Sequence, residues 1–204
     1  MADLFSAELE GLSLDELEER AREGCRKLWE EIYGGVNFVF GEGNPNADLM
    51  FIGEALGVEE DRLGRPFVGR AGRKLDEVLE SVGIRRQDVY ITNVIKARPP
   101  GNRTPQADEI ELSYPYLEAQ IAIINPKIIV TLGNVATQAL LKTTQGINAL
   151  RGRFHPWRGG IQVFPMFHPS YLLRNPSREK GSPKYLTWLD IQKVKQALEA
   201  ETAV

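Results

Sequence analysis

The fold class follows from residues 127–142, KIIVTLGNVATQALLK, where an apolar strand runs through a glycine directly into a helix. The first part is rich in isoleucine and valine and fits a buried strand, whereas the second part fits a short helix. A strand followed at once by a helix is typical of α/β proteins, in which helices cover both faces of a parallel sheet. This segment therefore predicts an α/β fold.

The same alternation extends outward from this segment toward both ends of the chain. Further strands are predicted at LMFIG (49–53), DVYITNV (88–94) and IQVFPMFH (161–168), with a short additional strand at VNFVF (36–40). Helices are predicted at residues 69–83, 106–124, 134–142 and 183–200. Two prolines qualify these elements: Pro115 should kink its helix or begin its second half, and Pro165 indicates an edge strand or a bulge. The pattern predicts a parallel sheet of four main strands, covered by helices.

An acidic segment precedes this body. Residues 13–33 predict an amphipathic helix, because Ser13 and Glu16 have the spacing of a capping box and leucines follow at helical intervals, although Gly24 weakens the middle. Residues 1–33 carry ten acidic and four basic residues, whereas the remaining 171 carry eighteen and twenty-one. We expect residues 1–35 to form an acidic helical segment that packs on a single domain of residues 36–204.

Length and composition fit one globular domain. The chain has 204 residues, of which 42% are hydrophobic and 26% charged, and it is long enough to bury its core without disulfides. Its one cysteine, Cys25, excludes an intramolecular disulfide and any metal or cluster site built from several thiolates. The first residues, MADLFSAELE, lack the pattern of a signal peptide, and no apolar run has the length of a membrane span. We expect an intracellular, cytoplasmic protein without membrane contact.

Polar and glycine-containing segments follow the four main strands. Ligands of open α/β sheets bind beyond the carboxyl ends of the strands. Those ends are GEALGVEED (53–61), NVIKARPPGNR (93–103), GNVATQ (133–138) and HPSYLLR (168–174). Residues 62–103 hold ten Lys/Arg against four Asp/Glu, although the net charge of the chain is −3. A basic rim on a slightly acidic protein predicts a polyanionic partner.

Each of these segments admits a structural and a functional interpretation. The GEALG loop lacks the full pattern of a dinucleotide or Walker A loop, so its glycines fit a tight turn at least as well as a nucleotide cofactor. Its acidic residues, among them Glu60, fit solvated helix-starting positions or groups that place a water or repel a wrong ligand. Phe67 fits the core or a stacking platform. Asn93 fits a strand cap or a reader of a nucleobase edge.

The basic loop and the last strand end are equally open. Lys96, Arg98 and Arg103 lie on a proline-stiffened turn that fits a solvated loop or contact with phosphates. His168 is one of only two histidines and fits a structural or a catalytic role. The exposed apolar tip expected at 171–173, beside Arg174, fits either a wedge entering a base stack or a helix start with buried leucines.

Four blocks in order resemble the family-four uracil-DNA glycosylases: GEALGVEEDRLGRPFVGRAG, YITNVIKARPPGNRTP, INPKIIVTLG and FHPSYLLRNPSR. The resemblance covers about residues 38–200. It implies a three-layer α/β/α sandwich with a four-stranded parallel central sheet. It also implies hydrolysis of the N-glycosidic bond between uracil and deoxyribose in DNA, which leaves an abasic site.

The resemblance also implies roles for individual residues. Phe67 would stack on the flipped uracil, Asn93 would bond its O4 and N3–H edge, and His168 would reach O2. Glu60 would exclude the thymine methyl group or influence the attacking water. The pocket would be lined by Gly53, Glu54 and Ala55, and Tyr171, Leu172, Leu173 and Arg174 would belong to a loop inserted into the minor groove. The other expected DNA contacts are Lys96, Arg98 and Arg103 of the basic turn, and Ser170.

The chain departs from that family in one group of residues and one loop. The family holds a four-iron, four-sulfur cluster on four cysteines, whereas the matching regions here offer Cys25, Ala97 and Ser113. We therefore expect no cluster, no other metal and no cofactor, with packing by Leu28, Trp29 and Tyr116 in its place. Leu56 replaces the proline of the family's loop, which can change the shape of the pocket.

These departures leave three hypotheses. The first is a monomeric, monofunctional glycosylase acting on uracil in double- or single-stranded DNA. The second is the same fold with altered base choice, for hypoxanthine or xanthine, as the change at Leu56 suggests. The third is a non-catalytic binder of damaged or single-stranded DNA.

Overall fold

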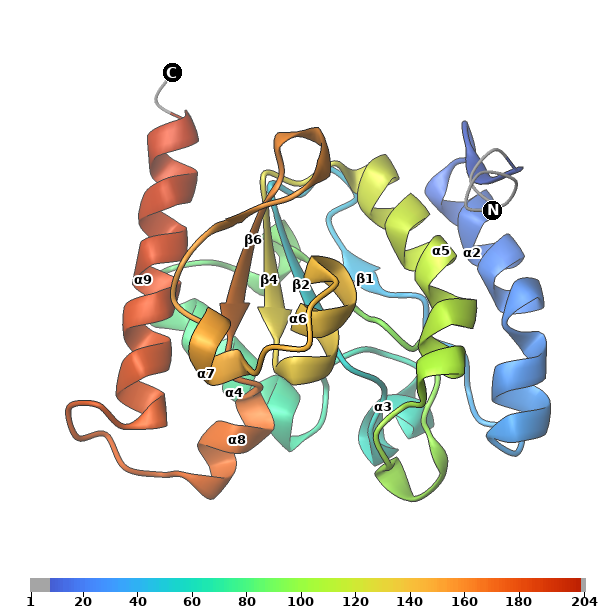
Figure 1. The fold of residues 1–204 in the computed structure, drawn as a ribbon, viewed down its shortest axis with the longest axis horizontal. Helices are drawn as coiled ribbons and strands as arrows, with labels where there is room; N and C mark the ends of the chain where they lie inside the picture. The colour runs from blue at the N-terminus through green and yellow to red at the C-terminus, as the bar shows by residue number, and fades with distance from the viewer. Residues whose placement is uncertain (1–7, 203–204) are drawn as a thin grey trace.

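The computed structural model describes residues 8–202, and within them six strands form one sheet in the order β1-β3-β2-β4-β6-β5 (Figure 1). The four inner strands run parallel: β3 (Tyr90–Asn93), β2 (Leu49–Gly53), β4 (Ile128–Leu132) and β6 (Gln162–Met166). Two-residue strands, β1 (Glu42–Gly43) and β5 (His155–Pro156), pair antiparallel at the edges. The predicted four-stranded parallel sheet is confirmed and carries a short antiparallel strand on each side.

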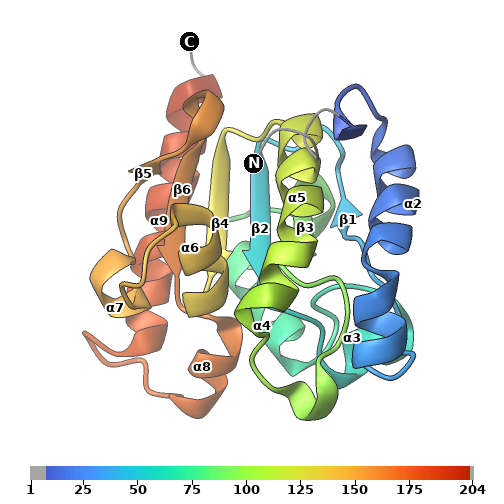
Figure 2. The ribbon, with the colours of Figure 1, turned by 45° about the vertical axis from the view of Figure 1, so that its right-hand side comes forward.

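Helices cover both faces of this sheet, as Figures 1 and 2 show. One face packs against α5 (Ala107–Ile124) and α6 (Asn134–Leu141), and the other against α4 (Arg70–Glu80) and α9 (Pro183–Thr202). Side chains of β2 alternate between the two layers, because Met50 and Ile52 belong to one buried cluster while Leu49 and Phe51 belong to the other. The three-layer α/β/α class is therefore confirmed.

Shorter elements cluster at the end of the sheet where the arrowheads of β2, β4 and β6 point (Figure 1). They include α3 (Val58–Leu63), α7 (Ile147–Leu150) and α8 (Pro169–Arg174). Three 3₁₀ turns complete the connections: η2 (Arg86–Asp88), η3 (Pro100–Asn102) and η4 (Arg158–Gly160). Among the described residues no helix has both the length and the apolar character needed to cross a membrane.

The two prolines inside predicted elements differ in their effect. Helix α5 runs through Pro115 as one element, so the proline does not begin a second half. Pro165 lies in β6, one position from the edge of the sheet, where β5 pairs only with Gln162 and Val163. Strand β6 is therefore not the edge strand that Pro165 suggested, but β5 ends before it reaches Pro165, so the missing N–H costs no ladder bond to β5.

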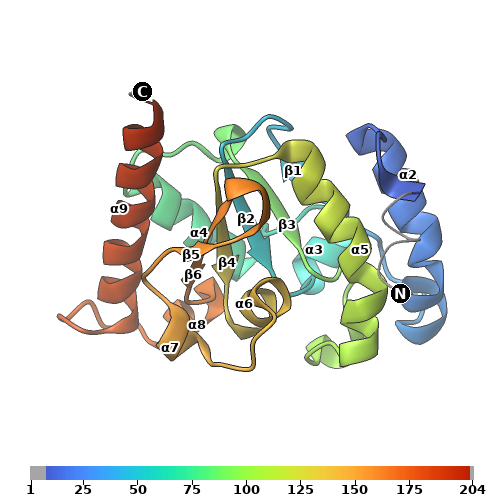
Figure 3. The same ribbon diagram turned by 45° about the horizontal axis from the view of Figure 1, so that its top comes forward.

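The predicted helix over 13–33 is confirmed in extent, but the chain forms two helical elements there in place of one. The capping box of Ser13 and Glu16 begins α2 (Leu14–Gly24), and a π-helix, η1 (Lys27–Ile32), follows it. Helix α2 packs on α5 at the outer side of the molecule, far from α9 (Figure 3). Residues 1–7 of the predicted N-terminal segment and residues 203–204 lie outside the described range.

The strand predicted at 36–40 is wrong. Phe38, Val39 and Phe40 are buried, but the pairing with β3 begins only at Glu42. The carbonyl of Phe40 accepts instead from the side chains of Thr92 and Gln120, at 2.6 and 3.1 Å. The N–H of Val39 still donates to the carbonyl of Lys96 at 2.7 Å, but side-chain donors take the carbonyl of Phe40, and no ladder forms over residues 36–40.

Gly24 lies where α2 approaches Tyr116 of α5 closely, so a larger residue at this position is expected to lower the stability of the protein. A Cβ at this position would lie 1.7 Å from the hydroxyl oxygen of Tyr116 on α5. We expect Gly24→Ala to lower the free energy of unfolding by about 1–3 kcal/mol, because α2 must move off α5 to make room. Urea denaturation measures this, with Gly146→Ala as the control, since that glycine has a φ of −78° and an added Cβ would meet only one atom, at 3.9 Å. Equal stability of the two variants would contradict the packing argument.

Candidate active site

A cavity of about 970 Å³ opens at the carboxyl ends of the parallel strands. Segments that follow all four inner strands contribute to its lining, as the rule for open α/β sheets requires. The predicted residues that line it are Glu54, Ala55, Glu60, Phe67, Asn93, Arg103, His168, Ser170, Tyr171 and Arg174. Glycine and polar residues after the strands therefore meet at one place, although they come from four distant parts of the chain.

Phe67 and Asn93 converge on Gly53. Gly53 is the last residue of β2 and pairs in register with Asn93, the last residue of β3. A Cβ on Gly53 would lie 2.5 Å from both the Asn93 Oδ1 atom and the Phe67 Cζ atom. Glycine is required here because any side chain would occupy the space in which the amide and the ring approach each other.

The Asn93 side chain carries an unused acceptor. Asn93 is 2% exposed, and its Oδ1 has no hydrogen-bond partner among the described residues. A buried carbonyl oxygen without a donor costs about 1–3 kcal/mol, so a fold retains one where a ligand supplies the donor. Asn93 lines the cavity, and its Oδ1 is therefore free to accept a hydrogen bond from an N–H group of a ligand.

His168 is held as a neutral imidazole. It caps the N-terminus of α8, where its Nδ1 accepts from the backbone N–H of Ser170 at 3.1 Å and lies 2.8 Å from the Ser170 hydroxyl. Burial lowers its pKa to about 4, with a further contribution from the positive charge of Arg174. A backbone N–H only donates, so Nδ1 carries no proton and the proton of the neutral ring sits on Nε2.

The rings of Phe67 and His168 lie beside each other. Their centroids are 5.9 Å apart and their planes are tilted by 34°. Gly133, which follows β4, has a φ of 88°, and a Cβ there would lie 3.1 Å from the Cβ of His168. The strand ends thus bring an aromatic face, a primary amide and a neutral imidazole to one cavity.

The loop after β2 continues the pairing with the loop after β3. The carbonyls of Gly53 and Glu54 accept from the N–H groups of Val94 and Ile95, at 2.9 and 3.0 Å. Leu56 donates its N–H to the carbonyl of Ala97 at 3.3 Å, a bond that proline at position 56 would lack. Leu56 lines the cavity, and burial raises the pKa of the neighbouring Glu54 carboxyl.

Glu60 is tied to the loop that carries Phe67. Its Oε1 accepts from the backbone N–H groups of Val68 and Gly69, at 2.9 and 2.7 Å. The carboxylate therefore fixes the backbone on one side of Phe67 while the residue also lines the cavity. Its effect on water or on the thymine methyl group stays a prediction.

Lys96 is not a DNA contact, contrary to the sequence prediction. It is 1% exposed, and its Nζ donates to Thr92 and Gln120 inside the protein. Burial lowers the pKa of its ammonium group to about 7. Polar partners on β3 and α5 and the ring of Phe40 therefore surround a side chain that the sequence placed on a surface loop.

Leu172 does not form an apolar tip, so the predicted wedge is wrong in this part. It is 2% exposed and belongs to α8, which packs against α4 and α9. Tyr171 is 36% exposed, and its ring rests on Phe167 with centroids 5.0 Å apart. Leu173 is partly buried and Arg174 exposed, so the surface left at this end of the cavity is aromatic and basic.

Of the remaining predicted cations on the basic loop, Arg103 lines the cavity and Arg98 does not. Arg98 donates to Asn102 at 2.7 Å, and Arg103 pairs with the buried Glu109. Both arginine side chains are partly exposed, at 27% and 34%. The sequence reasoning missed one side of the cavity, lined by Asn134, Gln138 and Asn148. The only signal for it was the polar segment after the third strand.

The residues do not fit an iron–sulfur cluster. Burial raises the pKa of Cys25 to about 11, so the one thiol of the chain stays protonated. Ala97 packs with Leu28 in an apolar cluster, and the Ser113 hydroxyl already donates to the carbonyl of Val94 at 2.7 Å. Within residues 8–202, no group of three or more potential metal ligands of the His, Cys, Asp and Glu types exists. A cluster needs four thiolates, which this donor set cannot supply.

Comparison of the sequence with known proteins shows the family. A sequence model of the uracil DNA glycosylase superfamily matches residues 40–192. A type-4 uracil-DNA glycosylase of Thermotoga maritima is 49% identical over 167 residues, which cover 81% of this chain and 85% of the relative. One from Saccharolobus solfataricus is 43% identical over 201 residues, covering 95% and 89%. A type-5 enzyme of Pyrobaculum aerophilum is 30% identical over 155 residues, covering 67% of each chain.

Proposed function

The chain belongs to the uracil-DNA glycosylase superfamily, and we propose that its cavity holds one uracil turned out of DNA while the N-glycosidic bond is hydrolysed. The reaction breaks the bond between uracil N1 and deoxyribose C1′. Water supplies a hydroxyl group to C1′, and its proton passes to the departing base. The product is free uracil and an abasic site in the DNA.

The observation that carries this proposal is the unpartnered Oδ1 of Asn93 beside the ring of Phe67. Uracil presents N3–H next to O4, so an amide that accepts with Oδ1 and donates with Nδ2 matches that edge. Cytosine has no proton on N3 and carries an amino donor in place of O4. The buried amide would then face an acceptor with its own acceptor, which costs about 1–3 kcal/mol.

His168 supports stabilisation of the departing base. As the bond breaks, negative charge develops on uracil, including O2. Because the proton of this neutral imidazole is on Nε2, that nitrogen donates a hydrogen bond to O2 and directs no lone pair at it. A preorganised donor of this kind stabilises the transition state more than the ground state.

Access to the base requires extrusion from the DNA, which costs roughly a few kcal/mol. Stacking of the extruded base on Phe67 offsets part of this cost, typically ~1–3 kcal/mol per base. We propose that Arg98, Arg103 and Arg174 contact phosphates of the DNA. We also propose that Tyr171 lies against the space that the extruded base leaves in the base stack. We also propose that one protomer, without a cluster or other cofactor, acts on double- and single-stranded DNA.

A competition assay tests the proposed function. Oligonucleotides of one sequence that carry uracil, hypoxanthine or xanthine are mixed at equal concentration, and abasic sites are cleaved with alkali. Fastest cleavage at uracil is the expected result. Faster cleavage at either purine favours the altered base choice that Leu56 suggests. Tight binding without cleavage of any strand supports the non-catalytic alternative.

A further inference from the structure

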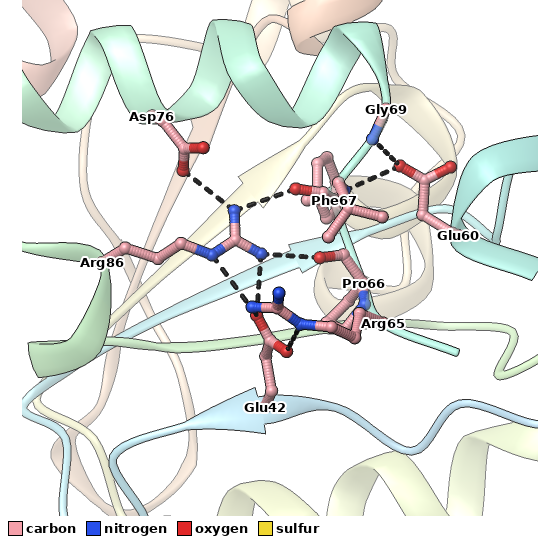
Figure 4. Close-up of polar contacts among 9 residues, drawn as sticks. Glu42, Glu60, Arg65, Pro66, Phe67, Gly69, Asp76 and Arg86 are labelled. Carbon is pink, nitrogen blue, oxygen red and sulfur yellow. Dashed lines mark hydrogen bonds and ion pairs between the residues drawn. The ribbon is translucent and has the colours of Figure 1, made fainter. Parts of the chain in front are cut away.

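We infer that Arg86, which lies outside the cavity, is a positioning residue for uracil excision that acts through Phe67. The inference rests on the proposed function of the cavity. Arg86 begins η2, between α4 and β3, and it does not line the cavity. Figure 4 shows its guanidinium beside the carbonyl groups of Pro66 and Phe67.

The loop needs support because Phe67 has an unfavourable backbone. Its φ is 51°, in the left-handed region, which costs a residue with a side chain roughly 1–2 kcal/mol. Relaxation of φ to negative values would rotate the ring away from Gly53 and Asn93. The observed conformation persists only if neighbouring groups hold both peptide units in place.

Arg86 holds the carbonyl side of this loop. Its Nη1 donates to the carbonyl of Phe67 at 2.9 Å, and its Nη2 donates to the carbonyl of Pro66 at 2.6 Å. Glu60 holds the amide side through Val68 and Gly69 (Figure 4). The positive Arg86 and the negative Glu60 therefore hydrogen-bond successive peptide groups before and after Phe67.

Two carboxylates fix the guanidinium itself. Glu42 accepts from Nε at 3.3 Å and from Nη2 at 3.0 Å, and Asp76 accepts from Nη1 at 2.9 Å. With the two carbonyls, all five N–H donors of the side chain are used. Glu42 comes from the edge strand β1 and Asp76 from α4, so two separate elements set the position of Arg86.

Helix α4 completes the support of the loop. A Cβ on Gly72 would lie 1.9 Å from the carbonyl oxygen of Phe67. The carbonyl therefore rests directly on the backbone of α4, between Gly72 and the guanidinium. Lysine at position 86 offers one ammonium in place of a planar fork and cannot reproduce this set of bonds.

A double-mutant cycle tests the inference. We expect Arg86→Gln to lower the single-turnover rate of uracil release ~10- to 100-fold, because a displacement of about 1 Å of the stacking ring has that effect. In a Phe67→Ala background, the same substitution should have no further effect on the rate. Binding to DNA that already contains an abasic site should stay unchanged, because no base then needs the ring.

Neighbouring arginines provide matched controls. Arg85→Gln removes an exposed guanidinium that pairs with Asp88, and Arg65→Gln removes the second partner of Glu42 without touching the loop carbonyls. Both should retain the wild-type rate within about two-fold. If Arg86→Gln does not fold, Asp76→Asn, which loosens one anchor, should show a smaller loss that again disappears without Phe67.

Two results would overturn the inference. One is a wild-type rate in the folded Arg86→Gln variant. The other is a loss that is as large in the Phe67→Ala background as alone, since that is the result of a general loss of structure. The wild-type protein run in parallel separates these results from failure of the proposed function, which would abolish release in every sample.

Discussion

Replacing His168 by alanine is expected to lower the single-turnover rate of uracil release by ~10²- to 10³-fold, the usual cost of losing one preorganised donor. The loss should lie in the chemical step, because binding of an abasic-site oligonucleotide does not need a donor to the base. His155→Ala is the matched control, since His155 bonds to the carbonyl of Leu150 outside the cavity. Equal rates of uracil release by His168→Ala and His155→Ala would show that His168 does not stabilise the departing base.

The pH dependence follows from the same residue. With a folded pKa of about 4, His168 stays neutral above pH ~5, so the rate should show no inflection near the ordinary histidine pKa of ~6.5. As the pH falls, His168 is protonated near pH ~6.5 in the unfolded chain but only near pH 4 in the folded protein. The contribution of His168 to stability is therefore complete above pH ~6.5 and is lost as the pH falls toward 4. Urea denaturation of the wild type and His168→Ala across this range measures the difference.

Asn93→Ala is expected to lower kcat/KM for uracil by ~10²-fold or more. The variant loses the acceptor for N3–H and the donor for O4 in one step, while the stacking surface of Phe67 remains. Stability should change by only about 1 kcal/mol, because Oδ1 has no partner to lose among the described residues. Asn46→Ala, at an exposed turn, is the control for both measurements. An Asn93→Ala variant that releases uracil at the wild-type rate would show that the amide does not read the base.

The main strands and their order along the chain could be predicted because they are short apolar runs bounded by glycine and turn residues. The same signal fails where side chains replace backbone pairing. The run at 36–40 has a strand pattern, yet Thr92 and Gln120 take the carbonyl of Phe40. Those partners lie 52 and 80 residues away in the sequence, and no local pattern reports them.

The candidate site was predictable in its centre and less so at its rim. Gly53, Asn93 and His168 lie at strand ends, so the topology of a parallel sheet brings them together. Lys96 was assigned to DNA contact from the basic loop and Leu172 from the expected tip and the family resemblance, but both side chains are buried. Arg86 gave no signal, because its contacts with the loop depend on folding of the edge strand and α4.

Single-turnover excision by protein of known iron content tests the central claim most directly. The protein in excess is mixed with a labelled oligonucleotide that carries one uracil, and the iron per chain is measured on the same sample. We expect complete conversion to alkali-labile sites by protein that contains essentially no iron. An oligonucleotide that stays intact, or activity that tracks with an iron content near four atoms per chain, would contradict the account.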